Sequence, residues 1–188
     1  MNYNIKCKLN NLVKVCFLDR DGTIIYDKHY LNNPDEVEII PSAITGMKML
    51  SKQGFNFYVI SNQSGISRKL CDVESQNKIN SLILEKLSKE NIMINEFIMC
   101  PHHPNDNCEC RKPNTKMFEE VTTRHLICKH KSIMIGDKLS DMLGAKRFGI
   151  CGYHVKTGED LKELKEILQL GFESFNTIEE IANAINEK

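Results

Sequence analysis

The sequence has no excess of charge of either sign. Its 188 residues include 25 basic and 25 acidic side chains, and the formal net charge is zero. Nonspecific binding to nucleic acid or to an anionic membrane depends on an excess of positive charge, so neither is expected as a partner. An anionic substrate would have to be held by local hydrogen-bond donors and cations.

Long apolar runs are also missing. The first residues contain no apolar stretch of signal-peptide length, and no run approaches the roughly 18 apolar residues that span a bilayer. We therefore expect a cytoplasmic location. Internal repeats and low-complexity linkers are absent too, and apolar residues make up 41% of the chain, as in ordinary globular proteins. The length predicts one domain over residues 1–188, and we expect a monomer.

Short apolar runs alternate with helical patterns along the chain. Runs rich in β-branched residues at 13–18, 55–60, 97–99 and 133–135 each end in polar residues, as buried strands do. Helical patterns cover 43–52, 72–89 and 115–125. After residue 149 we expect a strand at 150–155, a helix at about 160–168, and a last helix begun by a capping box of Thr177 and Glu180. The alternation predicts an α/β fold, with a mostly parallel sheet between helices.

Two pairs of aspartates follow strands of this sheet, whose carboxyl ends usually bind the ligand. Asp19 and Asp21 follow the first strand, and one carboxylate could attack phosphorus while the other handles a proton. Asp-x-Asp-Gly is also a common turn. Asp137 and Asp141 follow a later strand and could face one side of a helix start, although Asp is also a plain helix cap.

Phosphate-binding residue types occur at two other places. Ser61 and Asn62 stand at a strand end, where a hydroxyl and backbone N–H groups can hold phosphate oxygens. Arg111 and Lys112 would add cationic donors. Taken singly, a capping serine and a solvated basic pair are the ordinary alternatives.

Cysteine and histidine gather in one irregular segment, residues 100–113. Cys100, Cys108 and Cys110 with a histidine offer three thiolates and an imidazole, enough for a closed tetrahedral zinc site. The spacing is not the common Cys-x-x-Cys, so reduced surface thiols remain the alternative. Either His102 or His103 could be the fourth ligand.

The order of these segments resembles a known family. FLDRDGTI, SNQSGI, CRKP and GDKLSDM resemble the four motifs of the haloacid dehalogenase (HAD) superfamily, in its branch of heptose bisphosphate and histidinol phosphate phosphatases. The resemblance covers about residues 13–149 and implies a Rossmann-like three-layer sandwich. The lengths between the motifs leave no room for a separate cap domain, so we expect an open active site.

The resemblance implies a role for each motif residue. Asp19 would be the nucleophile and Asp21 the general acid and base, while Ser61 and Lys112 would stabilise the phosphoryl group. Asp19, Asp137 and the backbone carbonyl of Asp21 would bind Mg²⁺. Asp141 would orient Lys138 or a metal-bound water. The implied substrate-binding residues are Asp27, Lys28, His29, Tyr30, Asn62, Gln63, Ser64, Arg111 and Lys138.

Similar loops in this branch bind structural zinc, and the family position matches His102 rather than His103. The implied zinc ligands are therefore Cys100, His102, Cys108 and Cys110. Such a site would fix the loop that carries Arg111 and Lys112.

The resemblance further implies a small phosphorylated sugar as substrate. The first hypothesis is Mg²⁺-dependent hydrolysis of the 7-phosphate of D-glycero-D-manno-heptose 1,7-bisphosphate, in ADP- or GDP-heptose biosynthesis. Histidinol-phosphate phosphatase is the alternative enzyme. The non-enzyme alternatives are a phospho-receiver, which does not need the Asp-x-Asp-Gly-Thr motif, and a zinc-held interaction module, which does not need every catalytic position to be filled.

Overall fold

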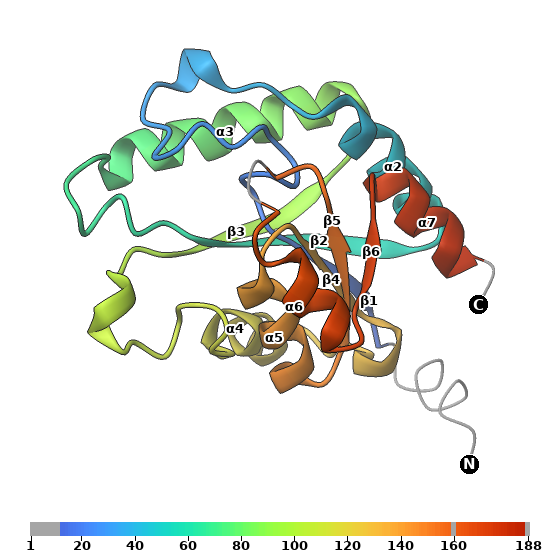
Figure 1. The fold of residues 1–188 in the computed structure, drawn as a ribbon. Coiled ribbons are helices and arrows are strands. Elements are labelled where there is room, and N and C mark those ends of the chain that lie inside the picture. The colour runs from blue at the N-terminus through green and yellow to red at the C-terminus, as the bar shows by residue number, and fades with distance from the viewer. Residues whose placement is uncertain (1–11, 159–160, 187–188) are drawn as a thin grey trace.

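The computed structural model describes residues 12–158 and 161–186, and within them six strands form one sheet (Figure 1). Every neighbouring pair is parallel, which confirms the expected parallel α/β architecture. The strand order is β3-β2-β1-β4-β5-β6. The strands are β1 (Lys14–Leu18), β2 (Phe55–Asn62), β3 (Ile94–Cys100), β4 (Ile133–Gly136), β5 (Cys151–Val155) and β6 (Glu173–Phe175).

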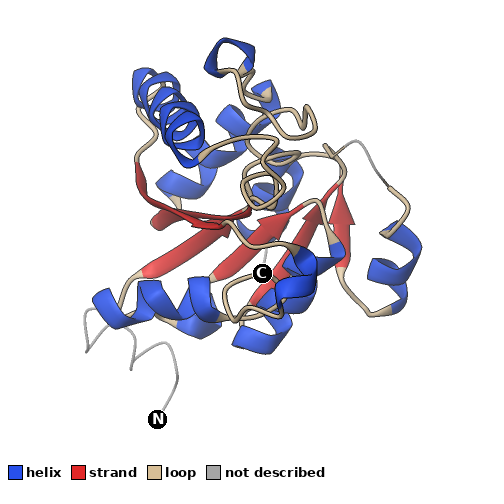
Figure 2. Cartoon of the chain, turned by 90° about the vertical axis from the view of Figure 1, so that its left-hand side faces the viewer, coloured by secondary structure: helices blue, strands red, loops and turns tan. Residues whose placement is uncertain are grey.

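Helices cover both faces of the sheet, so the fold has three layers (Figures 1 and 2). One face carries α2 (Pro41–Lys52), α3 (Val73–Lys89) and α7 (Ile178–Asn186). The other carries α4 (Lys116–Arg124) and α5 (Leu139–Phe148), with α6 (Leu164–Gln169) beside α5. The short 3-10 turns are η1 (Pro34–Glu36), η2 (Pro104–Asp106) and η3 (Lys129–Lys131).

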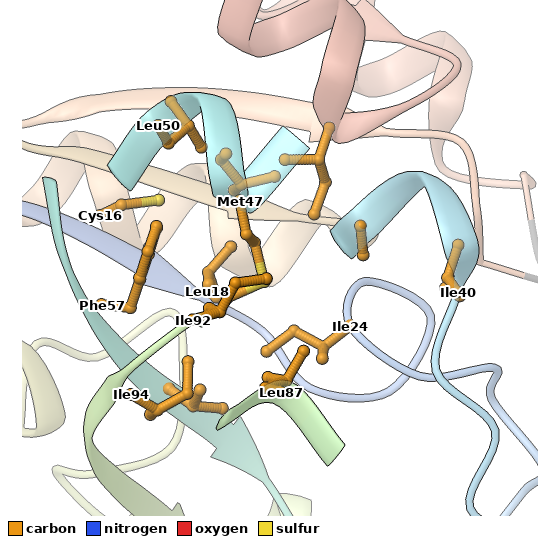
Figure 3. Close-up of a cluster of buried hydrophobic side chains, with 14 of the residues drawn as sticks. Cys16, Leu18, Ile24, Ile40, Met47, Leu50, Phe57, Leu87, Ile92 and Ile94 are labelled. Atoms are coloured by element: carbon orange, nitrogen blue, oxygen red, sulfur yellow. The ribbon is translucent and has the colours of Figure 1, made fainter. Parts of the chain in front are cut away.

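Strand β1 is buried on both faces because its side chains alternate between two cores. Cys16 and Leu18 face the core under α2 and α3, where Leu18 lies near Met47 (Figure 3). Phe17 faces the opposite core, with its ring centroid 4.9 Å from that of Phe118. Burial of each such side chain contributes roughly 1.5–3 kcal/mol. The strand that carries Asp19 is therefore held from both sides.

Several element boundaries differ from the sequence-based expectation. Ser61 and Asn62 belong to β2, since they pair with Met99 and Cys100 of β3. At the start of α7 the Glu180 N–H donates to the Thr177 hydroxyl, as expected, but the Glu180 carboxylate accepts from the N–H of residue 176 rather than of residue 177. Strand β6 was not predicted, and the predicted helix start near residue 160 lies outside the described residues.

The segments between the first strands are short. Between β1 and β2 the chain contains η1 and α2, and between β2 and β3 it contains α3. In the described part of the chain, no helix has both the length and the apolar composition needed to cross a membrane.

Candidate active site

The candidate site lies where the direction of strand addition reverses. Strand β1 lies between β2 and β4, and such switch points in parallel sheets open a crevice at the carboxyl ends of the strands. Asp19, Ser61 and Asp137 stand at these three strand ends. A cavity of about 290 Å³ opens there. It is lined by Asp19, Arg20, Asp21, Asp27, His29, Tyr30, Leu31, Ser61, Asn62, Gln63, Ser64, Gly65, Arg111, Lys138 and Ser140.

Lys112 is a buried lysine that contacts two aspartates of the site. Its side chain is 1% exposed, and Nζ lies 3.0 Å from Asp19 Oδ1 and 2.7 Å from Asp141 Oδ1. Nζ also donates to the Ile60 carbonyl at 2.6 Å. Burial alone would lower the pKa of Lys112, but the two carboxylates outweigh this effect and hold the pKa above its ordinary value. The lysine therefore stays charged.

Three carboxylates form a cluster suited to a divalent cation. Ligand atoms of Asp19, Asp137 and Asp141 lie within 4.8 Å of one another. Burial raises the pKa of Asp141 to about 6 and that of Asp137 well above its ordinary value. Among the described residues, Asp137 Oδ1 is buried without a hydrogen-bond partner. Carboxylate oxygens with uncompensated charge are ligands for a hard cation such as Mg²⁺, so these residues fit one.

Among the described residues, the donors that contact the Asp19 carboxylate both lie against Oδ1. The Arg20 N–H donates to Asp19 Oδ1 at 2.8 Å, and Lys112 contacts the same atom. Burial alone would raise the pKa of Asp19, but Lys112 and Lys138 outweigh it, and the pKa lies below its ordinary value. A charged carboxylate is the form that can act as a nucleophile.

The carboxylate of Asp137 lies against backbone that only glycine permits. A Cβ atom at Gly22 would lie 2.4 Å from Asp137 Oδ2, and one at Gly158 would lie 2.2 Å from the same atom. The Thr157 hydroxyl donates to the Gly22 carbonyl at 2.6 Å and joins the two segments. His154 Nε2 lies 3.0 Å from the Asp137 carbonyl. Sequence reasoning missed Gly158, Thr157 and His154, since they carry no recognisable motif.

The carboxylate of Asp21 is separate from the acidic cluster. It accepts hydrogen bonds from Arg20 and, at Oδ2, from Gln63 Nε2 at 2.7 Å. The same Gln63 nitrogen donates to Ser61 Oγ at 2.8 Å. Gln63, predicted to bind substrate, thus joins the predicted acid to the predicted phosphate-binding hydroxyl.

Asn62 fixes the backbone of Lys112. Its Oδ1 accepts from the Lys112 N–H at 2.9 Å, and its Nδ2 donates to the Lys112 carbonyl at 3.1 Å. Asn62 also lines the cavity. The side chain that sequence reasoning assigned to substrate therefore also positions the backbone of Lys112.

Asp27, His29, Tyr30, Leu31 and Lys138 line one part of the cavity. Asp27 Oδ2 lies 3.3 Å from Lys138 Nζ. His29 and Tyr30 line the cavity and both have positive φ, at 45° and 56°. Such conformations cost of order 1–3 kcal/mol each and are found mostly at functional sites. Lys28 differs, because it forms an ion pair with Glu38 and does not line the cavity.

Arg111 carries a hydrogen-bond donor that has no partner among the described residues. Arg111 lines the cavity, and in the described part of the chain its buried Nη1 has no hydrogen-bond partner. A buried guanidinium nitrogen without a partner is costly. An anionic group of a ligand would satisfy it.

The four predicted zinc ligands come together at the end of β3. Cys100 Sγ lies 3.6 Å from Cys108 Sγ and 3.2 Å from Cys110 Sγ, while His102 Nδ1 lies 3.1 Å from Cys110 Sγ. In a tetrahedral site with Zn–S bonds of about 2.3 Å, sulfur atoms would be about 3.8 Å apart. The cluster is therefore compatible with zinc. His103 faces another way, since its Nδ1 accepts from the N–H of residue 105.

Known proteins resemble this chain over most of its length. The chain is 32% identical over 166 residues to the D-glycero-alpha-D-manno-heptose-1,7-bisphosphate 7-phosphatase of Photorhabdus laumondii, which covers 84% of this chain and 90% of that protein. It is 36% identical over 134 residues to the corresponding beta enzyme of Helicobacter pylori, covering 71% and 78%. It is also 34% identical over 165 residues to the histidine biosynthesis bifunctional protein HisB of Campylobacter jejuni. That match covers 86% of this chain but only 46% of HisB.

Solved structures and a family model give the same relationship. The crystal structure of D,D-heptose 1,7-bisphosphate phosphatase from B. bronchiseptica, complexed with magnesium and phosphate, superposes with a TM-score of 0.82 at 27% identity, over 93% of this chain and 99% of that one. The family model for HAD-hydrolase-like proteins matches residues 109–181. These likenesses favour the enzyme over the receiver and interaction-module alternatives. The chain belongs to the HAD-like phosphatases, in the family that includes the heptose-1,7-bisphosphate 7-phosphatases.

Proposed function

We propose that this phosphatase hydrolyses the 7-phosphate of D-glycero-D-manno-heptose 1,7-bisphosphate, through an aspartyl-phosphate on Asp19, in ADP- or GDP-heptose biosynthesis. The observation that carries the proposal is the contact of Asp19, which lines the cavity, with the buried Lys112, with Asp137 and Asp141 close to Asp19. The heptose substrate is supported by the relatives named for it.

In the first step Asp19 attacks phosphorus in line with the leaving oxygen. Both protein donors to Asp19 go to Oδ1, so we assign the attack to Oδ2. The O–P bond to Asp19 forms as the P–O bond to the sugar breaks, and the sugar oxygen takes a proton from Asp21. Lys112 offsets the charge of the two anions that approach each other.

In the second step water attacks the aspartyl-phosphate. Asp21 accepts the proton of that water, the bond to Asp19 breaks, and phosphate leaves. Ser61 and Arg111 are placed along the cavity to donate to phosphate or substrate oxygens. Bound Mg²⁺, held by Asp19, Asp137 and the Asp21 backbone carbonyl, would neutralise phosphoryl charge.

The cysteine and histidine cluster would hold a structural Zn²⁺, to which we assign no direct chemistry. It precedes Arg111 and Lys112 in the chain and so supports the loop that carries both cations. The cytoplasmic location, the monomeric state and the single-domain organisation of residues 1–188 remain our predictions.

The test is phosphate release from both anomers of heptose 1,7-bisphosphate and from histidinol phosphate, with Mg²⁺ or with EDTA, beside Asp19→Asn. We expect kcat/KM for one heptose anomer to exceed that for histidinol phosphate by about 100-fold or more, and both EDTA and Asp19→Asn to abolish turnover. If histidinol phosphate is hydrolysed faster, the likeness to HisB gives the substrate and only the mechanism stands. If neither is hydrolysed, the substrate assignment is wrong.

A further inference from the structure

The feature that the proposed mechanism leaves unused is a buried arginine. Arg20 lies between the nucleophile and the proposed acid in the chain, and it is 1% exposed. Its guanidinium contacts Asp21 through two nitrogens, with Nε 3.1 Å from Oδ2 and Nη2 3.1 Å from Oδ1. A planar fork on a carboxylate fixes its position and its orientation together.

The third guanidinium nitrogen is held by helix α3. Nη1 donates to Gln76 Oε1 at 2.8 Å and to Asn80 Oδ1 at 3.1 Å. Both partners are neutral, so within the described residues Asp21 is the carboxylate that balances the buried Arg20 charge. An arrangement of this kind orients the carboxylate from the side away from the cavity.

Gln76 links Arg20 to the loop at residues 27–31. Its side chain is fully buried, and its Nε2 donates to the Leu31 carbonyl at 2.6 Å. Leu31 follows directly on His29 and Tyr30, the two cavity-lining residues with positive φ. The far end of that loop is tied by Asp27 to Lys138.

We propose that Arg20 is a positioning residue that sets the orientation of Asp21 and, through Gln76, ties it to the substrate-contacting loop at residues 27–31. The inference rests on the proposed function, in which Asp21 protonates the leaving group. One end of the chain of contacts acts on proton transfer, and the other end acts on substrate binding.

Arg20→Lys tests the first end. Lysine keeps a positive charge beside Asp21 but cannot form the fork, so we expect kcat for the sugar phosphate to fall about 10- to 100-fold, with KM changed little. The comparison is p-nitrophenyl phosphate, whose leaving group needs no proton. Its burst of nitrophenolate, measured in a stopped-flow instrument, should slow by less than about threefold.

Gln76→Leu tests the second end. It keeps both contacts of the fork on Asp21 and leaves Asn80 as an acceptor for Arg20 Nη1, but it removes the Gln76 acceptor and the donor to the Leu31 carbonyl. KM for the sugar phosphate should therefore rise about fivefold or more while the nitrophenolate burst is unchanged. Asn77→Leu, an exposed neighbour on α3, is the matched control and should behave as wild type. Circular dichroism melts show whether each variant is folded.

Two results overturn the proposal. If Arg20→Lys lowers the rate equally with the sugar phosphate and with p-nitrophenyl phosphate, Arg20 has a structural role only. An unchanged KM in Gln76→Leu would break the link to the loop, and this arm decides the matter if Arg20→Lys does not fold. A wild-type chain that hydrolyses the aryl ester but not heptose bisphosphate would instead reject the proposed substrate, and any sugar phosphate that it does hydrolyse then serves in the same comparison.

Discussion

Nζ of Lys112 lies 2.7 Å from Oδ1 of Asp141, and both side chains are shielded from solvent. The contact joins the segment after the cysteine cluster to the first turn of α5. A buried lysine is tolerated only when its charge is balanced, and here Asp19 shares the balance.

Lys112→Met should therefore harm both stability and activity. It leaves the buried carboxylates of Asp19 and Asp141 without the cation that contacts them, and removal of one partner of a buried pair costs about 3–5 kcal/mol of unfolding free energy. Loss of a charge-stabilising donor should also lower kcat by about 100-fold or more. Urea unfolding and phosphate release measure the two effects. Lys138→Met, at a lysine side chain that is 46% exposed, is the control and should cost no more than about 1 kcal/mol; equal costs would contradict the charge argument.

Gly158→Ala should weaken metal binding although it replaces none of the proposed metal ligands. The added Cβ would meet Asp137 Oδ2 at 2.2 Å, so the carboxylate must move. We expect the Mg²⁺ concentration for half-maximal activity to rise about tenfold or more, which corresponds to about 1.4 kcal/mol. Gly54→Ala is the control, because it strains a positive φ but meets nothing within 4 Å. An unchanged Mg²⁺ dependence in Gly158→Ala would show that Asp137 is not needed in its present position.

Asn62→Ala should displace the active-site lysine through its backbone. Two hydrogen bonds to Lys112 disappear, and a misplacement of about 1 Å in an active site lowers the rate about 100-fold. The kcat/KM of the sugar phosphate, measured well below the melting temperature, checks this. Asn56 lies on β2 as Asn62 does, and its side chain makes a weak hydrogen bond to the Lys14 carbonyl of β1. Asn56→Ala removes that bond and should leave the rate near wild type. Equal kcat/KM for Asn62→Ala and wild type would show that neither its bonds to Lys112 nor a contact with substrate is needed.

The cysteine cluster predicts a measurable metal content. The purified chain should carry about one zinc per chain by elemental analysis, and Cys110→Ser should lose most of it. Cys151→Ser, at an exposed cysteine outside the cluster, should keep it. After treatment with a strong chelator, Mg²⁺ alone should restore only part of the activity, while Zn²⁺ and Mg²⁺ together should restore the rest. A metal-free protein with full activity would remove the structural role.

Much of the fold could be predicted because β1 to β4 are short apolar runs that end in polar residues. Asp19 and Asp137 follow such runs, so their meeting at one edge of the sheet follows from parallel topology alone. Strand β6 escaped prediction because Glu173–Phe175 is only three residues long and only partly buried. Its position is set by backbone pairing with the edge of β5, which is a contact between distant parts of the chain.

The parts of the site that sequence reasoning missed depend on distant approaches. Gly158 contacts Asp137 only because β5 returns the chain beside β4, and glycine has no side chain to signal a role. Sequence reasoning gave Arg20 no role, because its burial and its contacts with Asp21 depend on the packing of helix α3. The family resemblance implied a substrate contact for Lys28, but Lys28 pairs with Glu38 and does not line the cavity.

The strand order determines when the parts of the site can come together during synthesis of the chain. Strand β1 is made first, yet its neighbour β4 begins more than a hundred residues later, and Gly158, against Asp137, comes later still. Until then one side of β1 is an open strand edge, which is the kind of surface that pairs wrongly with other chains. A partly synthesised chain therefore holds the proposed nucleophile, Asp19, without the rest of the proposed metal site. If Asp19 and Asp137 act as proposed, hydrolysis begins only after the chain has folded as far as Gly158, so activity reports on folding through that residue.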